Sequence, residues 1–137
     1  MVSWVIQFIA AVLAFVLLDF VWLGFVVKNF TLRQLAELGR IADGKFQVLY
    51  APAFVTYFLM ALAVVVYVVP QVRESSLINA YLFGALLGLI VFGVYEMTNM
   101  AVLKNYPLPF ALVDMVWGTF AFGSVTLIVK WTAERIS

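Results

Sequence analysis

Three acidic residues lie inside otherwise apolar stretches of the chain: Asp19, Glu96 and Asp114. A carboxyl group at membrane depth costs free energy, so an ionisable residue there indicates a binding site, an ion pathway or a proton relay by default. Carboxyl groups can attract a cation, exchange a proton or act as general acid and base. We therefore expect the chemistry of this protein where these three side chains meet.

Each acid is accompanied by polar or aromatic residues at helical spacing, which places them on a shared helix face. These companions are Trp22 beside Asp19, Asn99 beside Glu96, and Trp117 beside Asp114, and Tyr95 shares a face with Asn99. The sequence predicts a ligand-binding pocket formed by the three acids and these companions. The alternative is a polar cluster that only fixes helix packing, with at least one acid neutral. Because interhelical hydrogen bonds in membranes contribute only about 0.6 kcal/mol on average, acids suit that purpose poorly and we prefer the pocket.

The composition requires lipid as the main solvent. The chain has 137 residues, of which 66% are hydrophobic and 11% are charged, whereas soluble domains are about 45–50% apolar and about 25% charged. A soluble chain this small could not bury so much apolar surface. The formal net charge of +1 provides no basic surface for nucleic acid.

The chain contains neither Cys nor His. Disulfides, thiol nucleophiles and iron–sulfur ligation are therefore excluded, as are imidazole zinc sites and Ser-His-Asp catalysis. We predict no cofactor and no metal. If a metal binds at all, its ligands are expected to be Asp19, Glu96 and Asp114 around a hard cation such as Mg²⁺.

Four apolar stretches predict transmembrane helices, at residues 2–27, 48–69, 77–103 and 109–129. The predicted fold is an all-α, polytopic, four-helix membrane domain over residues 1–137. The first stretch is too long for a signal-peptide core and has no basic leader, so it is expected to be retained. Pro70 is expected to close the second span, and residues 130–137 are expected to form a short polar tail.

The polar loop at residues 28–47 predicts a short amphipathic helix between the first two spans. Residues 31–34, Thr-Leu-Arg-Gln, fit a capping box that starts a helix. Leu35, Leu38 and Ile41 then recur every third residue, which favours a helix on the membrane face or across the end of the bundle. A simple connector and a lid remain alternative interpretations. Asp43-Gly44 is a plausible break.

The three acids are expected at one depth, near the membrane face that carries residues 28–47 (the loop side). Asp19 and Glu96 each lie about eight residues inside the end of a span, roughly 12 Å deep, and Asp114 lies about five residues after the start of its span, roughly 7–10 Å deep. Lys28 and Lys104 lie at the loop-side boundary. Either could gate the pocket or neutralise one acid.

Small residues indicate where helices approach closely. Gly84-x-x-x-Gly88 permits close contact with a neighbouring backbone, and Gly118 is a further packing position. Tyr50, Tyr57 and Tyr67 are expected to serve interfacial belts and packing.

Four motifs in this order resemble a bacterial family of small predicted membrane proteins, the domain of unknown function 2177. They are D-x-x-W-L-G at 19–24, Y-E-M-T-N at 95–99, Lys-x-x-Pro at 104–107 and D-x-x-W-G at 114–118. The family's T-Y-D-x-T-N pattern has Val94 and Glu96 here, and its Phe-Tyr pair at the second span corresponds to Leu49-Tyr50. The resemblance covers essentially the whole chain. It implies a four-helix, multi-pass protein of the bacterial inner membrane and brings no established activity.

Three functions remain open, and the residues do not decide whether the protein is an enzyme. The pocket could bind or transport a small cationic or amphipathic molecule, including a lipid. It could serve a lipid-modifying enzyme or its accessory subunit, or the protein could be structural, with Gly84 and Gly88 as a contact face. Four spans make a thin conduit, so transport predicts at least a homodimer in the bilayer. The excess of basic residues on the loop side favours a cytoplasmic loop side.

Overall fold

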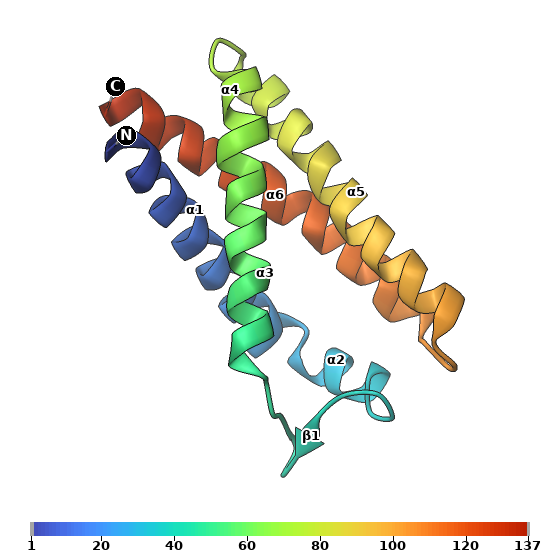
Figure 1. Cartoon of the computed structure of the whole chain (residues 1–137). Helices are drawn as coiled ribbons and strands as arrows, with labels where there is room; N and C mark the ends of the chain where they lie inside the picture. Colours follow the sequence, from blue (N-terminus) through green and yellow to red (C-terminus); the bar gives the residue numbers. More distant parts are fainter. Residues whose placement is uncertain (1, 137) are drawn as a thin grey trace.

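Four long helices dominate the computed structural model, which describes residues 2–136 (Figure 1). These spans are Val2–Val26, Tyr50–Val72, Leu77–Val102 and Leu108–Ile136. Each exceeds the roughly 20 residues that cross a bilayer core. A helix satisfies its own backbone hydrogen bonds, which lipid cannot do. The predicted all-α, four-span membrane fold is confirmed.

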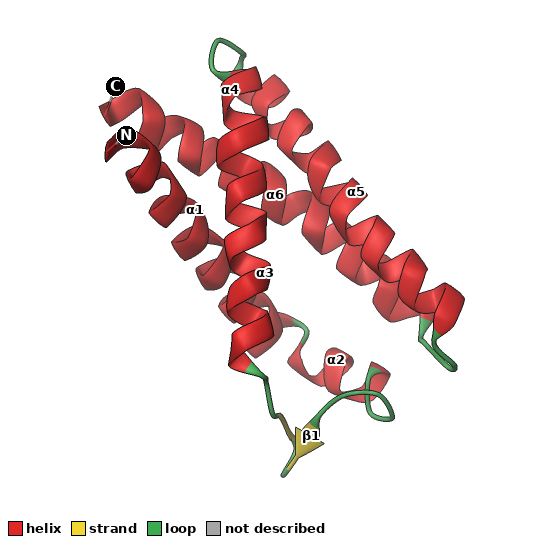
Figure 2. Cartoon of the chain, viewed as in Figure 1, coloured by secondary structure: helices red, strands yellow, loops and turns green. Residues whose placement is uncertain are grey.

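Residues 2–136 form six α-helices, two π-helical segments and one small hairpin, with α2 and the hairpin between the first two spans (Figure 2). In chain order they are α1 (Val2–Val21), η1 (Trp22–Val26), α2 (Lys28–Gln34), β1 (Ile41–Ala42), β2 (Lys45–Phe46), α3 (Tyr50–Leu62), η2 (Ala63–Val68), α4 (Val69–Val72), α5 (Leu77–Val102) and α6 (Leu108–Ile136). Both described ends of the chain lie at the face opposite the loop side (Figure 1).

The core runs along the contact of α1, η2 and α6. Phe15 of α1 packs against Phe122 of α6, with ring centroids 4.9 Å apart, and Val64 and Val125 are fully buried beside them. Large apolar side chains also cover the outer surface, among them Leu17, Phe58, Leu59, Leu82 and Val116. A soluble protein would not expose so many, so the outer surface is suited to lipid.

Glycines bring α5 and α6 into close contact. A Cβ atom on Gly84 would collide with Thr126, and one on Gly88 would collide with the carbonyl of Gly118. Gly118 in turn has the ring of Phe92 where its own Cβ would stand. The Gly84–Gly88 face is thus occupied by a helix of the same chain, which leaves the assembly hypothesis without its expected contact surface.

Two ends of the predicted spans differ from the structure. The second span continues through Pro70 to Val72, because the π-helical segment η2 precedes the proline. Its wider turn accommodates a ring that would otherwise clash with the preceding carbonyl. The fourth span continues to Ile136, so the expected polar tail is helical over its described part. Buried Lys130 stabilises this end, since its Nζ donates hydrogen bonds to the Arg73 carbonyl (2.8 Å) and to Glu134 (2.7 Å).

The loop-side segment contains the expected short helix in a different register. The predicted capping box is wrong, because α2 begins at Lys28 and the Thr31 amide already donates to the Val27 carbonyl at 2.8 Å. Thr31 is therefore inside the helix and buried. The break at Asp43-Gly44 is present as a hairpin turn with positive φ at both residues, which matches a type I′ turn between β1 and β2. The hairpin was not expected from the helical spacing of the leucines.

Candidate functional site

A partly open cavity of about 1190 Å³ lies at the loop side, between the ends of the spans and the segment that contains α2 and the hairpin. α5 packs against η2 and α4, whereas its loop-side end diverges from that of α3 (Figure 1). Both ends line the cavity. Its polar lining residues are Asp19, Thr31, Gln47, Tyr50, Tyr57, Tyr95, Glu96, Asn99, Tyr106 and Asp114. No Lys or Arg of residues 2–136 lines it.

Glu96 is the most deeply buried of the acids, with no exposed surface. The hydroxyl of Tyr106 donates a hydrogen bond of 2.6 Å to its Oε2 atom. The Asn99 amide nitrogen donates in turn to the Tyr106 oxygen at 3.4 Å. Within the described residues the other carboxyl oxygen, Oε1, has no hydrogen-bond partner. A buried polar atom without a partner costs free energy, so Oε1 is the natural place for a proton or a guest to bind.

Tyr106 lies in the turn between α5 and α6, outside the membrane spans. Burial and the hydrogen bond to Glu96 both raise the pKa of Tyr106. The hydroxyl therefore stays protonated at neutral pH and remains a donor to Glu96.

Asp19 joins three spans. Its Oδ2 atom accepts a hydrogen bond of 2.7 Å from the Tyr57 hydroxyl, and its Oδ1 atom accepts one of 2.8 Å from the indole nitrogen of Trp117. Two donors from α3 and α6 thus fix a carboxyl group of α1. Both donors are neutral, so they satisfy the two carboxyl oxygens without adding a positive charge to the site.

The two D-x-x-W motifs meet in space. Trp22 stacks on Trp117, with ring centroids 4.5 Å apart and planes 1° from parallel. Asp114, from the second motif, lines the same cavity as Asp19 and Glu96. Neighbouring carboxyl groups repel one another unless a proton or a cation lies between them. The three acids therefore form one electrostatic cluster.

Of the seven residues expected to bind a ligand, five line the cavity: Asp19, Tyr95, Glu96, Asn99 and Asp114. Trp22 and Trp117 do not line it. They form the stacked pair behind Asp19, with Trp117 buried and its indole N–H bound to the carboxylate. The indoles thus support the acids instead of facing a guest.

The two lysines expected to gate or neutralise the pocket lie elsewhere. Lys28 and Lys104 are both exposed, and neither lines the cavity. The ion pair found within residues 2–136 joins Lys130 and Glu134, at the opposite end of α6. Within the described residues, therefore, no basic side chain forms an ion pair with Asp19, Glu96 or Asp114.

Two tyrosines in the site were missed. Tyr57, expected in a packing role, donates to Asp19. It lies seven residues into α3, roughly 10 Å from the loop-side end, and this depth matches that of Asp19. Tyr106 was overlooked inside the Lys-x-x-Pro motif, although a tyrosine in the turn directly after the Glu96 helix can reach back to that helix.

In the part of the chain that the structure describes, no group of three or more His, Cys, Asp or Glu side chains is arranged to hold a metal ion. A metal site shared by Asp19, Glu96 and Asp114 therefore gains no support from the structure and stays a prediction.

The model of one protein family, described as "Predicted membrane protein (DUF2177)", matches residues 4–131 of the chain. Searches of curated proteins and of solved structures find no significant match.

Proposed function

This chain belongs to the DUF2177 family of predicted membrane proteins, and we propose that its loop-side cavity binds a small amphipathic molecule with a cationic head. The proposal rests above all on Glu96. This fully buried acid has one unpartnered carboxyl oxygen among residues 2–136 and faces a cavity lined by three acids. A positively charged guest supplies the partner that Oε1 lacks.

The charge of the cavity favours a cation over an anion. Asp19, Glu96 and Asp114 contribute negative groups, and no basic residue within the described chain lines the walls. Charges attract strongly where the surroundings exclude water. Tyr57 and Tyr95 add aromatic rings, whose faces attract cations.

The remaining walls favour an apolar body on the guest. Phe20, Leu23, Phe54 and Phe110 are among the residues that line the cavity. Residues of α3 and of α5 both line the partly open cavity, so we propose that a guest dissolved in the bilayer enters between these two helices. An amphipathic molecule could place its head against the acids and its body among these side chains.

Binding is expected to be coupled to protons. Glu96 and Asp114 line one cavity, and no basic residue of the described chain lines it with them, so we expect the crowded carboxyl groups to share a proton when no guest is bound. A cation that takes this place displaces the proton. The same exchange is the basic step of proton-coupled transport, and we propose a homo-oligomer for that role because four spans enclose too little space for a conduit.

Two ions of the same size and shape but opposite charge test the proposal. Tetraphenylphosphonium should bind to the protein in lipid nanodiscs, and tetraphenylborate should not, after subtraction of binding to empty nanodiscs. Glu96→Gln should weaken phosphonium binding about tenfold, which corresponds to about 1.4 kcal/mol. Glu37→Gln is the matched control, because Glu37 is exposed and lies on the loop side outside the cavity.

Two outcomes would contradict it. Equal binding of the two ions would remove the argument from charge. Unchanged phosphonium binding in both Glu96→Gln and Asp114→Asn would show that the acid cluster does not hold the guest.

A second candidate is a lipid-modifying enzyme or its accessory subunit. The hydrogen bond of 2.6 Å between Tyr106 and Glu96 forms a pair able to pass a proton to and from a bound lipid. Comparing membrane lipids of cells that express wild-type protein or Tyr106→Phe tests this function. Identical lipid profiles would leave it unsupported.

We propose the bacterial inner membrane as the location, from the family resemblance, with the loop side in the cytoplasm. The loop side carries five basic residues, Lys28, Arg33, Arg40, Lys45 and Lys104, and the opposite face carries three, Arg73, Lys130 and Arg135. This excess favours a cytoplasmic loop side. A reporter that is active only in the cytoplasm should be inactive when fused to either terminus.

A further inference from the structure

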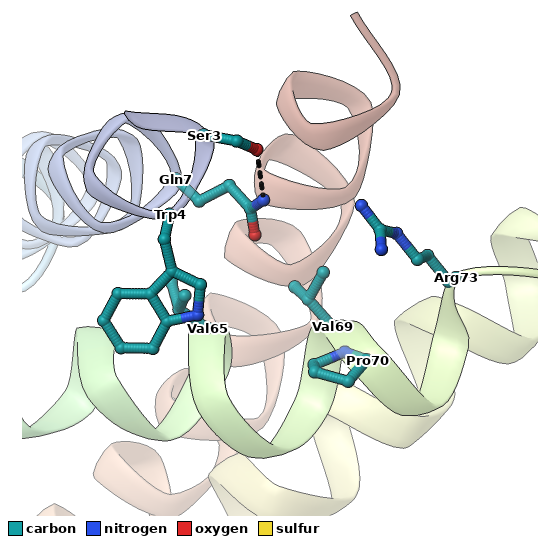
Figure 3. Close-up of a pocket in the computed structure, with 7 residues that line it drawn as sticks. All are labelled: Ser3, Trp4, Gln7, Val65, Val69, Pro70 and Arg73. Atoms are coloured by element: carbon teal, nitrogen blue, oxygen red, sulfur yellow. Dashed lines mark hydrogen bonds between the residues drawn. The ribbon is translucent and has the colours of Figure 1, made fainter. Parts of the chain in front are cut away.

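A second, smaller cavity of about 180 Å³ lies at the opposite membrane face, between the start of α1 and the end of α4 (Figure 3). Its polar lining consists of Ser3, Trp4, Gln7 and Arg73, and its apolar lining includes Val69 and Pro70. The loop-side acids are not part of it. Its chemistry is therefore independent of the function proposed above.

The lining is rich in hydrogen-bond donors. The Arg73 guanidinium extends from the end of α4 toward Gln7 and Ser3 (Figure 3). Buried Gln7 donates one amide hydrogen to the Ser3 oxygen at 3.1 Å, which leaves its second amide hydrogen and the Ser3 hydroxyl hydrogen free for another acceptor. Trp4 adds an indole N–H at the edge of the cavity. No carboxylate of residues 2–136 lines the site.

Buried Lys130 holds this arrangement in place. Its ammonium group donates to the backbone carbonyl of Arg73 at 2.8 Å and to Glu134 at 2.7 Å. The first contact fixes the backbone from which the Arg73 side chain extends. The second pairs Glu134 with Lys130, and the described residues contain no ion pair to Arg73 itself. The guanidinium is thus positioned and remains available to an anion.

We propose that this cavity binds a phosphate group, namely that of an anionic phospholipid in the leaflet opposite the loop side. A guanidinium matches a phosphate with two parallel hydrogen bonds. Arg73 directly follows the second span, and Trp4 lies near the start of the first, so both are at the level of the headgroups, where indoles concentrate. The cavity accommodates a headgroup phosphate, and the lipid chains extend along the apolar outer surface.

Native mass spectrometry of the delipidated protein tests this site. Phosphatidylglycerol added back to the delipidated protein should bind to the wild type, and Arg73→Gln should weaken its retention about tenfold, as expected for the loss of a charge-assisted hydrogen-bond pair. Arg73→Lys keeps the positive charge but cannot make the two parallel hydrogen bonds of a guanidinium, so it should cause an intermediate loss of lipid retention. Arg135→Gln is the matched control, since Arg135 lies at the same face and packs over the Trp131 ring at 4.9 Å.

The outcomes distinguish a lipid phosphate from inorganic phosphate, and they distinguish this site from the loop-side cavity. Inorganic phosphate, tested alone by calorimetry, should bind far more weakly than the lipid. Binding of inorganic phosphate with no retention of phosphatidylglycerol would overturn the lipid as occupant. Equal losses of phosphatidylglycerol retention in Arg73→Gln and Arg135→Gln would show that any positive charge at this face attracts the anionic lipid, and this result would overturn the site. Glu96→Gln changes only the loop-side cavity and should leave the retention of phosphatidylglycerol unchanged. The phospholipid site can therefore be confirmed or overturned independently of the loop-side proposal.

Discussion

The hydroxyl of Tyr106 donates a hydrogen bond of 2.6 Å to the Oε2 atom of Glu96, which lies ten residues earlier and is fully buried. This contact ties the turn between α5 and α6 to an acid that lines the loop-side cavity. It gives one carboxyl oxygen a partner and leaves the other directed to the guest or proton that the site is proposed to hold.

Tyr106→Phe should destabilise the protein. The substitution keeps the ring but leaves both Glu96 oxygens without a donor in the described structure. An unsatisfied buried acceptor costs about 1–3 kcal/mol. Thermal unfolding in detergent, followed by circular dichroism, should show a lower midpoint. Tyr67→Phe is the control, because Tyr67 is exposed on the outer surface and should unfold like the wild type.

Stability should fall in alkaline solution, in part through Tyr106. Its pKa is raised in the folded protein by burial and by the bond to Glu96. The stabilisation of the folded protein that this raised pKa provides is fully present below the ordinary tyrosine pKa of about 10. At higher pH the unfolded chain releases the proton and the folded chain retains it, so stability decreases. The melting midpoint should fall less steeply with rising pH in Tyr106→Phe than in the wild type, and equal slopes would contradict this assignment.

The stacked indoles of Trp22 and Trp117, 4.5 Å apart, should produce an exciton couplet in the circular dichroism spectrum. Trp22→Phe should abolish the couplet and cost about 0.5–1.5 kcal/mol of stability, the contribution of an aromatic pair. Trp131→Phe should leave it intact, because Trp131 is exposed and far from the pair in the chain. A couplet that survives Trp22→Phe would rule out the stacked geometry.

Gly88→Ala should destabilise the contact between α5 and α6. The added methyl group would meet the backbone carbonyl of Gly118, which cannot move aside as a side chain can, and overpacking of this kind costs about 1–3 kcal/mol. Gly93→Ala on the same helix meets only the flexible end of Met115, at 3.3 Å, and should be close to neutral. Equal midpoints for the two variants would show that the helices do not meet at Gly88.

Much of the fold follows from local sequence. Lipid supplies no hydrogen bonds, so long apolar stretches must be helices, and the four spans are where the composition predicts them. The ends were less predictable. The end of the second span depends on how η2 accommodates Pro70, and that of the fourth on the contact of Lys130 with Arg73.

The gathering of the acids at one depth also follows from counting residues along helices that alternate in direction, because the rise per residue is constant. Asp19, Glu96 and Asp114 indeed line one cavity. Counting gives depth along the membrane normal. It does not give the rotation of each helix about its own axis, and rotation determines which side chains touch.

Helix packing therefore determines which side chains form hydrogen bonds with the acids. Trp117 reaches Asp19 across 98 residues of sequence, and Tyr57 reaches it across 38. The same packing turned both indoles away from the cavity and placed Arg73 beside Gln7 at the other face. Residue types and spacing indicated the candidate site residues, whereas the rotations and crossings of α1, α3, α5 and α6 selected the contacts that these residues make.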